Sequence, residues 1–225
     1  MVTRARFPGA ASFVPADHRL GTLAAAARHC EGCDLYQRAT QTVFGLGPPD
    51  AAIMLVGEQP GDAEDTAGEP FVGPAGRLLD RALADAHIDR AAAYVTNAVK
   101  HFRWKSTDHG PRRLHEKPAT AHLQACRPWL AAELGALQPQ VIVALGATAS
   151  ESLLGRGFRL TERRGQILDW TPDVDAFGSA LDSSVRGVVA TIHPSAVLRA
   201  DKDRRAQAYD GLVADLRMAA TVVDG

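Results

Sequence analysis

The 225-residue sequence has few cysteines, almost no net charge and no long apolar run. Three cysteines and no apolar signal segment within residues 1–18 argue against a disulfide-stapled secreted protein, so we expect a cytoplasmic one. No apolar run approaches the roughly 20 residues that a membrane helix needs, which predicts a protein without membrane contact. Because 25 Lys and Arg face 26 Asp and Glu, any binding of nucleic acid must come from local patches.

The apolar fraction of 46% is ample for a packed core, and the length fits one domain over residues 1–225. We expect residues 1–18 to form an irregular arm and the protein to be a monomer. Short continuous apolar runs, typical of strands buried on both faces, alternate with helical segments. These strand candidates cover residues 53–56, 94–97, 141–145 and 188–192, with residues 165–170 as a further candidate. The alternation predicts a three-layer α/β/α sandwich around a central, mostly parallel four-stranded sheet.

Unusual polar residues follow three of these strands directly. They occupy residues 58–62, 97–101 and 193–195. In open α/β sheets the ligand crevice lies outside the carboxyl ends of the strands. We therefore expect the three groups to meet at one edge of the sheet and to form an active site there.

The side chains of these groups suit the cleavage of a glycosidic bond to a base. The carboxylate of Glu58 can stabilise a cationic sugar, while an amide or an imidazole such as that of His193 can support an anionic base. Phe71, in the loop that follows, can stack on a flipped base, and Asn97 can hydrogen-bond its polar edge. Each residue also has a purely structural interpretation. Glu58 could be a solvated acid in a turn, and His193 a structural histidine. Phe71 could belong to the core, and Asn97 could cap the strand end.

Cys30 and Cys33 form a CxxC pair that follows a helical segment. Thiolates at this spacing bind zinc or an iron–sulfur cluster. Cys126 is the candidate third ligand, and His101, directly after the second strand, is the candidate fourth. The alternative is a buried structural Cys126 with a free CxxC. A thioredoxin-like redox pair is disfavoured, because such a pair opens a helix after a strand.

Residues 101–118 have little periodicity and many charges, which predicts a long loop. They include five Lys and Arg against two acidic residues, with Phe102 and Trp104 nearby. Basic residues interleaved with aromatic ones suit single-stranded DNA, although an ordinary solvated loop has a similar composition. His115 lies in this loop, and a neutral imidazole can attack an electrophilic sugar carbon.

Taken together, these motifs resemble the iron–sulfur uracil-DNA glycosylases of family 4. The resemblance runs from about residue 30 to the C-terminal helix and rests on several motifs in order, which makes it specific. The motifs are Gly57-Glu-Gln-Pro-Gly-Asp62, Pro70-Phe-Val-Gly-Pro-Ala-Gly-Arg-Leu-Leu-Asp80, Thr96-Asn-Ala-Val-Lys100 and His193-Pro-Ser195.

Two departures from family 4 resemble the UdgX branch. Family 4 has a cysteine where this chain has His101, and it lacks the basic insertion that ends at His115. The branch usually reads Lys-Arg-Arg-Ile-His in this insertion, whereas this chain has Pro111 in place of the lysine and Leu114 in place of the isoleucine. Proline at position 111 cannot make the phosphate contact that a lysine would make, while Arg112, Arg113 and His115 match the motif.

The resemblance implies a mechanism and a cofactor. Uracil flips from single-stranded DNA into the pocket, where Phe71 stacks on it and Asn97 reads its edge. Glu58 stabilises the oxocarbenium ion and His193 supports the departing uracil. His115 then attacks the sugar carbon, which leaves a covalent protein–DNA adduct after one turnover. The implied catalytic residues are His115, Glu58, His193, Gln59 and Asp62; those that bind substrate are Phe71, Asn97, Gly57, Arg113, Arg112 and Ser195; and a [4Fe–4S] cluster that braces the DNA-binding loop is held by Cys30, Cys33, His101 and Cys126.

Two other functions remain open. A conventional multi-turnover glycosylase would use the same residues with His115 as a spectator. A non-catalytic nucleic-acid-binding module with structural zinc would be colourless, whereas an iron–sulfur cluster absorbs visible light.

Overall fold

The computed structural model describes residues 7–107, 110–171, 177 and 185–224. At its centre is a five-stranded sheet with the order β2-β1-β5-β7-β6. Four of these strands pair in parallel, and β6 pairs antiparallel to β7. The strands are β1 (Ile53–Gly57), β2 (Ala93–Asn97), β5 (Val141–Leu145), β6 (Ile167–Leu168) and β7 (Gly187–Thr191). The mostly parallel sheet predicted from the apolar runs is therefore confirmed.

The prediction of four strands was wrong by one strand. Strand β6 is two residues long, and only Leu168 is buried, while Ile167 is exposed. A segment this short carries no periodic signal, so the sequence offered residues 165–170 only as a further candidate. The four parallel strands, in contrast, are buried at every position. Burial on both faces explains why β1 and β5 are continuous apolar runs and why β2 and β7 are mostly apolar.

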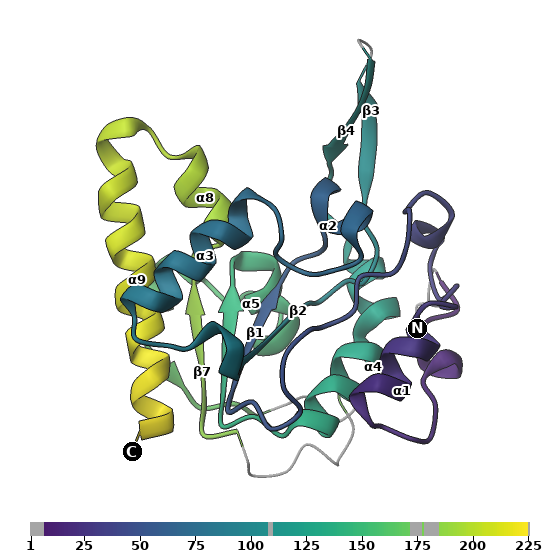
Figure 1. Ribbon diagram of the computed structural model, residues 1–225, viewed down its shortest axis with the longest axis horizontal. Coiled ribbons are helices and arrows are strands. Elements are labelled where there is room, and N and C mark those ends of the chain that lie inside the picture. The colour runs from purple at the N-terminus through teal and green to yellow at the C-terminus, as the bar shows by residue number, and fades with distance from the viewer. Residues whose placement is uncertain (1–6, 108–109, 172–176, 178–184, 225) are drawn as a thin grey trace.

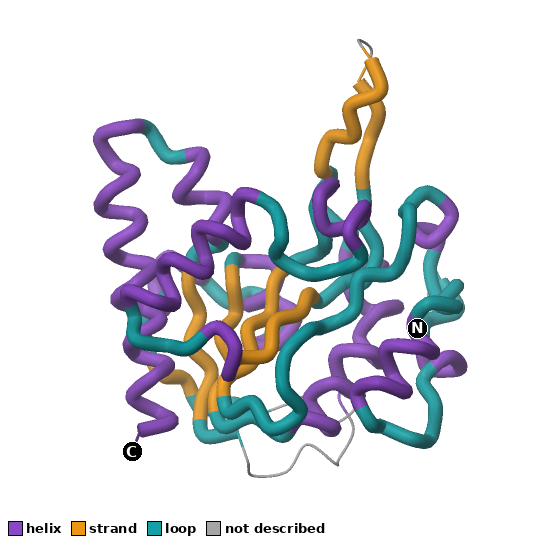
Figure 2. Tube along the Cα trace, in the orientation of Figure 1, coloured by secondary structure: helices purple, strands orange, loops and turns teal. Residues whose placement is uncertain are grey.

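Helices cover both faces of the sheet, which gives the three layers (Figures 1 and 2). Alternate strand residues supply the two cores: Leu55 and Val143 face α3, α8 and α9, while Met54 and Ile142 face α4 and α5. The α-helices are α1 (Leu20–Ala27), α2 (Asp62–Ala67), α3 (Pro74–Asp85), α4 (Thr120–Leu137), α5 (Ala147–Leu154), α6 (Leu160–Arg163), α8 (Pro194–Arg199) and α9 (Lys202–Asp224). Short 3-10 helices are η1 (Ala11–Phe13), η2 (Asp34–Gln37) and η3 (Arg90–Ala92).

The segment predicted as a long loop contains a β-hairpin instead. Strands β3 (Trp104–Thr107) and β4 (Gly110–His115) pair antiparallel, with Trp104 opposite His115. The hairpin stands out from the body of the molecule (Figure 1). A projecting two-stranded ribbon buries little surface on either face. Its strands therefore need no alternation of apolar and polar residues, and the sequence gave no sign of them.

The N-terminal arm is packed against the cysteine region. Residues 7–18 of the predicted arm include η1, and Gly9 N donates to Gly32 O while Ala10 N donates to Ala125 O. Ala10 is buried as a result. Residues 1–6 lie outside the described part of the chain. Among the described residues, no helix combines the length and apolar character that crossing a membrane requires.

Candidate active site

The carboxyl ends of β1, β2, β5 and β7 border a cavity of about 1110 Å³. Residues that follow all four parallel strands line it, as the position of ligand sites in open α/β sheets leads one to expect. Most of the residues singled out from the sequence meet here. Those that line the cavity are Glu58, Gln59, Asp62, Phe71, Asn97, His115, His193 and Ser195.

Glu58 follows β1, and each of its two carboxylate oxygens contacts a different polar side chain. Its Oε2 accepts a hydrogen bond from the hydroxyl of Thr148 at the start of α5. Its Oε1 lies 3.4 Å from Nε2 of His115. The side chain is 19% exposed, so the charge is only partly solvated. A partly desolvated anion beside an imidazole is suited to stabilising a cation that forms between them.

Gln59 ties the hairpin base to this site. Its Oε1 accepts from Arg103 N at 3.1 Å, and its Nε2 donates to Arg103 O and Glu116 O at 3.1 Å each. The same Nε2 lies 3.0 Å from Nε2 of His115. The two carbonyls and the backbone N–H fix the orientation of the amide, so that its nitrogen faces the imidazole.

The imidazole of His115 is shifted toward its neutral form. Burial lowers its pKa, and the positive charge of Arg199 lowers it further against the opposing effect of Glu58. The side chain is nevertheless 49% exposed and lines the cavity. A neutral, accessible imidazole nitrogen can act as a nucleophile.

His193 presents its other nitrogen to the cavity. Its Nδ1 accepts hydrogen bonds from the backbone N of Ser195 at 3.1 Å and lies 2.8 Å from that residue's hydroxyl. Burial, with help from Arg199 and His115, lowers the pKa of His193 to about 4. The ring is thus neutral at physiological pH and carries its proton on Nε2, where it can donate to a negative charge without itself being charged.

Phe71 and Asn97 line the same cavity. The Phe71 ring stacks on His193, with centroids 5.8 Å apart and an interplanar angle of 29°. Phe71 has a φ of +58°, which is rare for a bulky side chain and indicates stored strain. A β-carbon at Gly57 would overlap Asn97 Oδ1 and lie 2.7 Å from Phe71 Cζ. Glycine is needed at this position because both side chains approach the backbone closely.

Asp62 and Arg113 make an ion pair that holds the hairpin to the body. Arg113 Nε lies 2.6 Å from Asp62 Oδ1, and its Nη1 pairs with the buried Asp65. The guanidinium also lies over the rings of Phe102 and Trp104, at 5.4 and 5.6 Å from their centroids. This arginine is thus occupied inside the protein. The side chain of Arg112, the other arginine assigned to substrate binding, lies outside the described structure.

The three cysteines gather in one buried cluster beside α1 and α4. Burial raises the pKa of Cys33 to about 11 and that of Cys126 to about 12, and the thiols of Cys30 and Cys33 raise the latter further. Among the described side chains, no group of three or more His, Cys, Asp or Glu could hold a single metal ion. Gathered, buried thiols are the donors that an iron–sulfur cluster takes.

His101 has the hydrogen bonding expected of a ligand. The hydroxyl of Thr42 donates to Ala27 O at 2.9 Å, so it accepts from His101 Nε2, also at 2.9 Å. Burial lowers the pKa of His101 to about 4, which leaves a neutral ring with an unprotonated Nδ1. Ligating histidines commonly donate their second N–H in this way. In addition, the buried Nε1 of Trp129, in the same cluster, has no hydrogen-bond partner within the described structure. The residues present therefore fit an iron–sulfur group.

Two residues of the cavity were missed by the sequence analysis. Thr148 lies in the first turn of α5, three residues after the end of β5, so the rule that ligand sites lie beyond the strand ends also points to it. Arg199 donates to the hydroxyl of Ser195 at 3.0 Å from one turn further along α8. Residues four apart on a helix are neighbours, so a helix predicted after His193 would have placed Arg199 beside Ser195.

The chain was compared with known proteins. Residues 44–217 match the Uracil DNA glycosylase superfamily. The chain is 34% identical over 176 residues to the type-4 uracil-DNA glycosylase of Pyrobaculum aerophilum, which covers 76% of this chain and 81% of that protein. It is 35% identical over 173 residues to the type-4 enzyme of Thermotoga maritima, with 76% and 79% covered, and equally identical over 173 residues to that of Archaeoglobus fulgidus, with 75% and 78% covered. With a matched region that spans all four parallel strands and the cavity, the chain belongs to the uracil DNA glycosylase superfamily and is homologous to its type-4 members.

Proposed function

We propose that this protein excises uracil from single-stranded DNA and then becomes covalently joined, through His115, to the abasic site it has made. One observation carries the covalent step. The imidazole of His115 is half exposed at the cavity, and its Nε2 lies 3.0 Å from Gln59 Nε2 and 3.4 Å from Glu58 Oε1. The carboxylate that would stabilise a sugar cation is thus next to a nucleophile that can trap it.

Recognition of the base rests on Phe71 and Asn97. A flipped uracil that enters the cavity can stack on the Phe71 ring and hydrogen-bond with the Asn97 amide. Gly57 lets these two side chains approach each other, and the strained backbone of Phe71 holds its ring in place. The pocket wall is therefore preorganised before DNA binds.

Bond cleavage uses His193 and Glu58. The bond between C1′ and N1 of uracil breaks, and its electron pair leaves with the uracil. The Nε2–H of neutral His193 donates to the oxygen on which this charge accumulates. The carboxylate of Glu58, fixed by the hydroxyl of Thr148, stabilises the cation left on the sugar.

Capture by His115 completes the reaction. The lone pair on Nε2 forms a bond to C1′, and the resulting imidazolium then loses the Nδ1 proton to solvent. No water enters the sugar, and the enzyme is consumed after one turnover. This step distinguishes the UdgX-like proposal from a conventional glycosylase, in which water would attack the same carbon.

A [4Fe–4S] cluster would be held by Cys30, Cys33, Cys126 and Nδ1 of His101. Bound there, it would supply a rigid cross-link between the helix-flanking thiols and the segment that leads into the hairpin. The backbone N of Lys100 already donates to Cys126 Sγ at 3.3 Å, which ties this segment to α4. We propose a bracing role for the cluster.

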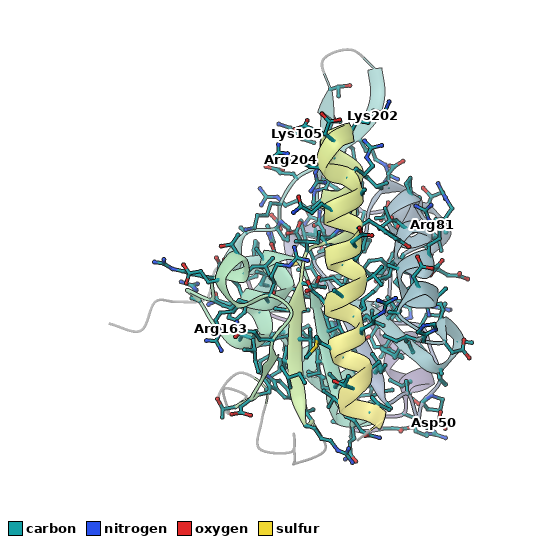
Figure 3. All side chains as sticks on the ribbon, turned by 90° about the vertical axis from the view of Figure 1, so that its left-hand side faces the viewer. Asp50, Arg81, Lys105, Arg163, Lys202 and Arg204 are labelled. Atoms are coloured by element: carbon teal, nitrogen blue, oxygen red, sulfur yellow. The ribbon has the colours of Figure 1, made fainter. Side chains whose placement is uncertain are left out.

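The DNA would cross the end of the molecule that carries the hairpin. Lys105 on the hairpin and Lys202 and Arg204 at the start of α9 lie at this end of the molecule (Figure 3). Exposed Lys and Arg side chains neutralise phosphates without reading sequence. We propose that the protein acts there as a cytoplasmic monomer.

The decisive experiment mixes the purified protein with uracil-containing single-stranded DNA and resolves the products on a denaturing gel after boiling in detergent. We expect a slowly migrating band that survives denaturation. His115→Ser should remove this band while leaving abasic DNA, and the exposed His18→Ser serves as the matched control. Free abasic DNA from the wild-type protein would favour a conventional glycosylase, and intact DNA would overturn the proposal.

A further inference from the structure

A lysine and a glutamate form an ion pair in the interior, next to the end of β2 that carries Asn97. Lys100 Nζ and Glu133 Oε2 are in contact, and both side chains are 0% exposed. Lys100 follows β2 by three residues and Glu133 lies on α4. Burying two charges costs far more than a surface pair would, so their retention calls for a local reason.

All three protons of the Lys100 ammonium are used. Besides contacting Glu133, Nζ donates to Thr96 Oγ1 at 2.6 Å and to the backbone carbonyl of Asn97 at 2.8 Å. The ring of Phe44 lies 5.2 Å from the same nitrogen. The lysine therefore folds back on the strand that precedes it and closes the turn of residues 97–100.

The carboxylate of Glu133 is equally saturated. Its Oε1 accepts from Tyr94 OH and Thr96 Oγ1 at 2.9 Å each, and from Gly45 N at 3.2 Å. Thr96 thus links the two charges, because its hydroxyl accepts from Lys100 and donates to Glu133. A network satisfied to this degree fixes one arrangement of the strand end.

This network ends at the residue that faces the base. The Asn97 carbonyl is held by Lys100, and its side chain points at the cavity, against Gly57. Val99 N donates to Glu58 O at 3.0 Å, so the same turn also abuts the strand end that carries the catalytic carboxylate. An amide that must match the edge of uracil gains from a backbone that cannot shift.

We propose that the buried Lys100–Glu133 pair is a positioning element for uracil recognition, which acts by locking the backbone of Asn97. The inference rests on the proposed function, because it assigns the reading of the base to Asn97. Neither charged residue touches the substrate.

The test is a double-mutant cycle between Glu133 and Asn97, measured as the single-turnover rate of uracil excision. We expect Glu133→Gln to slow excision roughly 10- to 100-fold, the range that a small misplacement at a reacting centre produces. In an Asn97→Ala background the same change should alter the rate by less than about twofold, since no positioned amide remains. The affinity for free uracil should fall in parallel in the Glu133→Gln protein.

Two further variants separate positioning from folding. Thr96→Val removes the linking hydroxyl while keeping the side-chain shape, and it should show the same non-additivity in a milder form. Leu130→Ala, a buried core change on the same helix, should lower thermal stability without changing excision at a temperature where the protein is folded. Equal slowing by Glu133→Gln in both backgrounds would overturn the positioning role alone. A wild-type protein that leaves uracil in DNA would overturn the proposed function and this inference with it.

Discussion

Gln59 and His115 are joined by a contact of 3.0 Å between the side-chain amide nitrogen and the imidazole Nε2. Since the amide also bonds to both ends of the hairpin base, it fixes the position of the histidine relative to the body of the protein. A glutamine two residues after a buried strand thus controls a side chain 56 positions away in sequence.

Removal of this amide should separate adduct formation from excision. Gln59→Ala removes the side-chain bridge to Arg103 and Glu116 and the amide that lies against the imidazole. We expect the ratio of adduct to free abasic product to fall by about tenfold, which corresponds to the loss of one hydrogen bond worth about 1.4 kcal/mol. Both products can be read from the same denaturing gel. An unchanged ratio would mean that Gln59 does not orient the nucleophile.

A methyl group at position 57 should close the base pocket. Gly57→Ala pushes against Asn97 and Phe71, so we expect excision to slow by on the order of 100-fold, as misplacement by a fraction of an ångström can cause. Gly135→Ala is the control, because nothing lies within 4 Å of its new methyl group. In the interior of α4 that change should stabilise the protein by roughly 0.5–1 kcal/mol. Single-turnover kinetics and thermal unfolding measure the two effects.

Replacement of Arg113 by lysine should loosen the hairpin although the charge is kept. Lysine cannot pair with Asp62 and Asp65 together while lying over two aromatic rings. We expect adduct yield to fall by about tenfold, with a smaller loss of excision, because the hairpin carries His115 and not the base pocket. Lys105→Met on the same hairpin is the comparison: it should weaken DNA binding but leave the ratio of the two products unchanged.

The acid limit of excision should reflect His193. Its pKa is lowered from 6.5 to about 4, so the neutral donor persists well below pH 6 and activity should fall only as the pH drops through about 4. Arg199→Gln removes a nearby positive charge and should move this limit to higher pH, by a small amount because burial is the larger cause. The contribution of neutral His193 to folding stability is complete above pH 6.5 and is lost as the pH falls toward 4. Circular dichroism across the same range separates unfolding from titration.

The sequence predicted the features that depend on local pattern. Continuous apolar runs revealed β1, β2, β5 and β7, and the rule that ligands lie beyond the carboxyl ends of strands placed Glu58, Asn97 and His193 at one cavity. Strand β6 escaped clear assignment because two residues carry no period. The hairpin was predicted as a loop because a ribbon in solvent has no buried face to pattern.

The sequence could not predict partners that only the tertiary structure supplies. Glu133 lies in an ordinary helical stretch and would be taken for a solvated acid, yet it is buried because Lys100 reaches it from another element. Arg113 was assigned to substrate binding, and its two carboxylate partners on α2 were not foreseen. In both cases the interaction spans more than 30 residues, far beyond any helical or strand period.

The closure at the hairpin base has an evolutionary consequence. Glu116 N donates to Arg103 O at 3.0 Å, their side chains form an ion pair, and Gln59 bridges both residues, so the chain leaves and rejoins the body at a single point. Residues 104–115 therefore form a cassette that a lineage can gain or lose without rebuilding the sheet. Under the proposed function, gain of these residues would add the covalent step to an excision enzyme, and their loss would remove that step while leaving the base pocket in place.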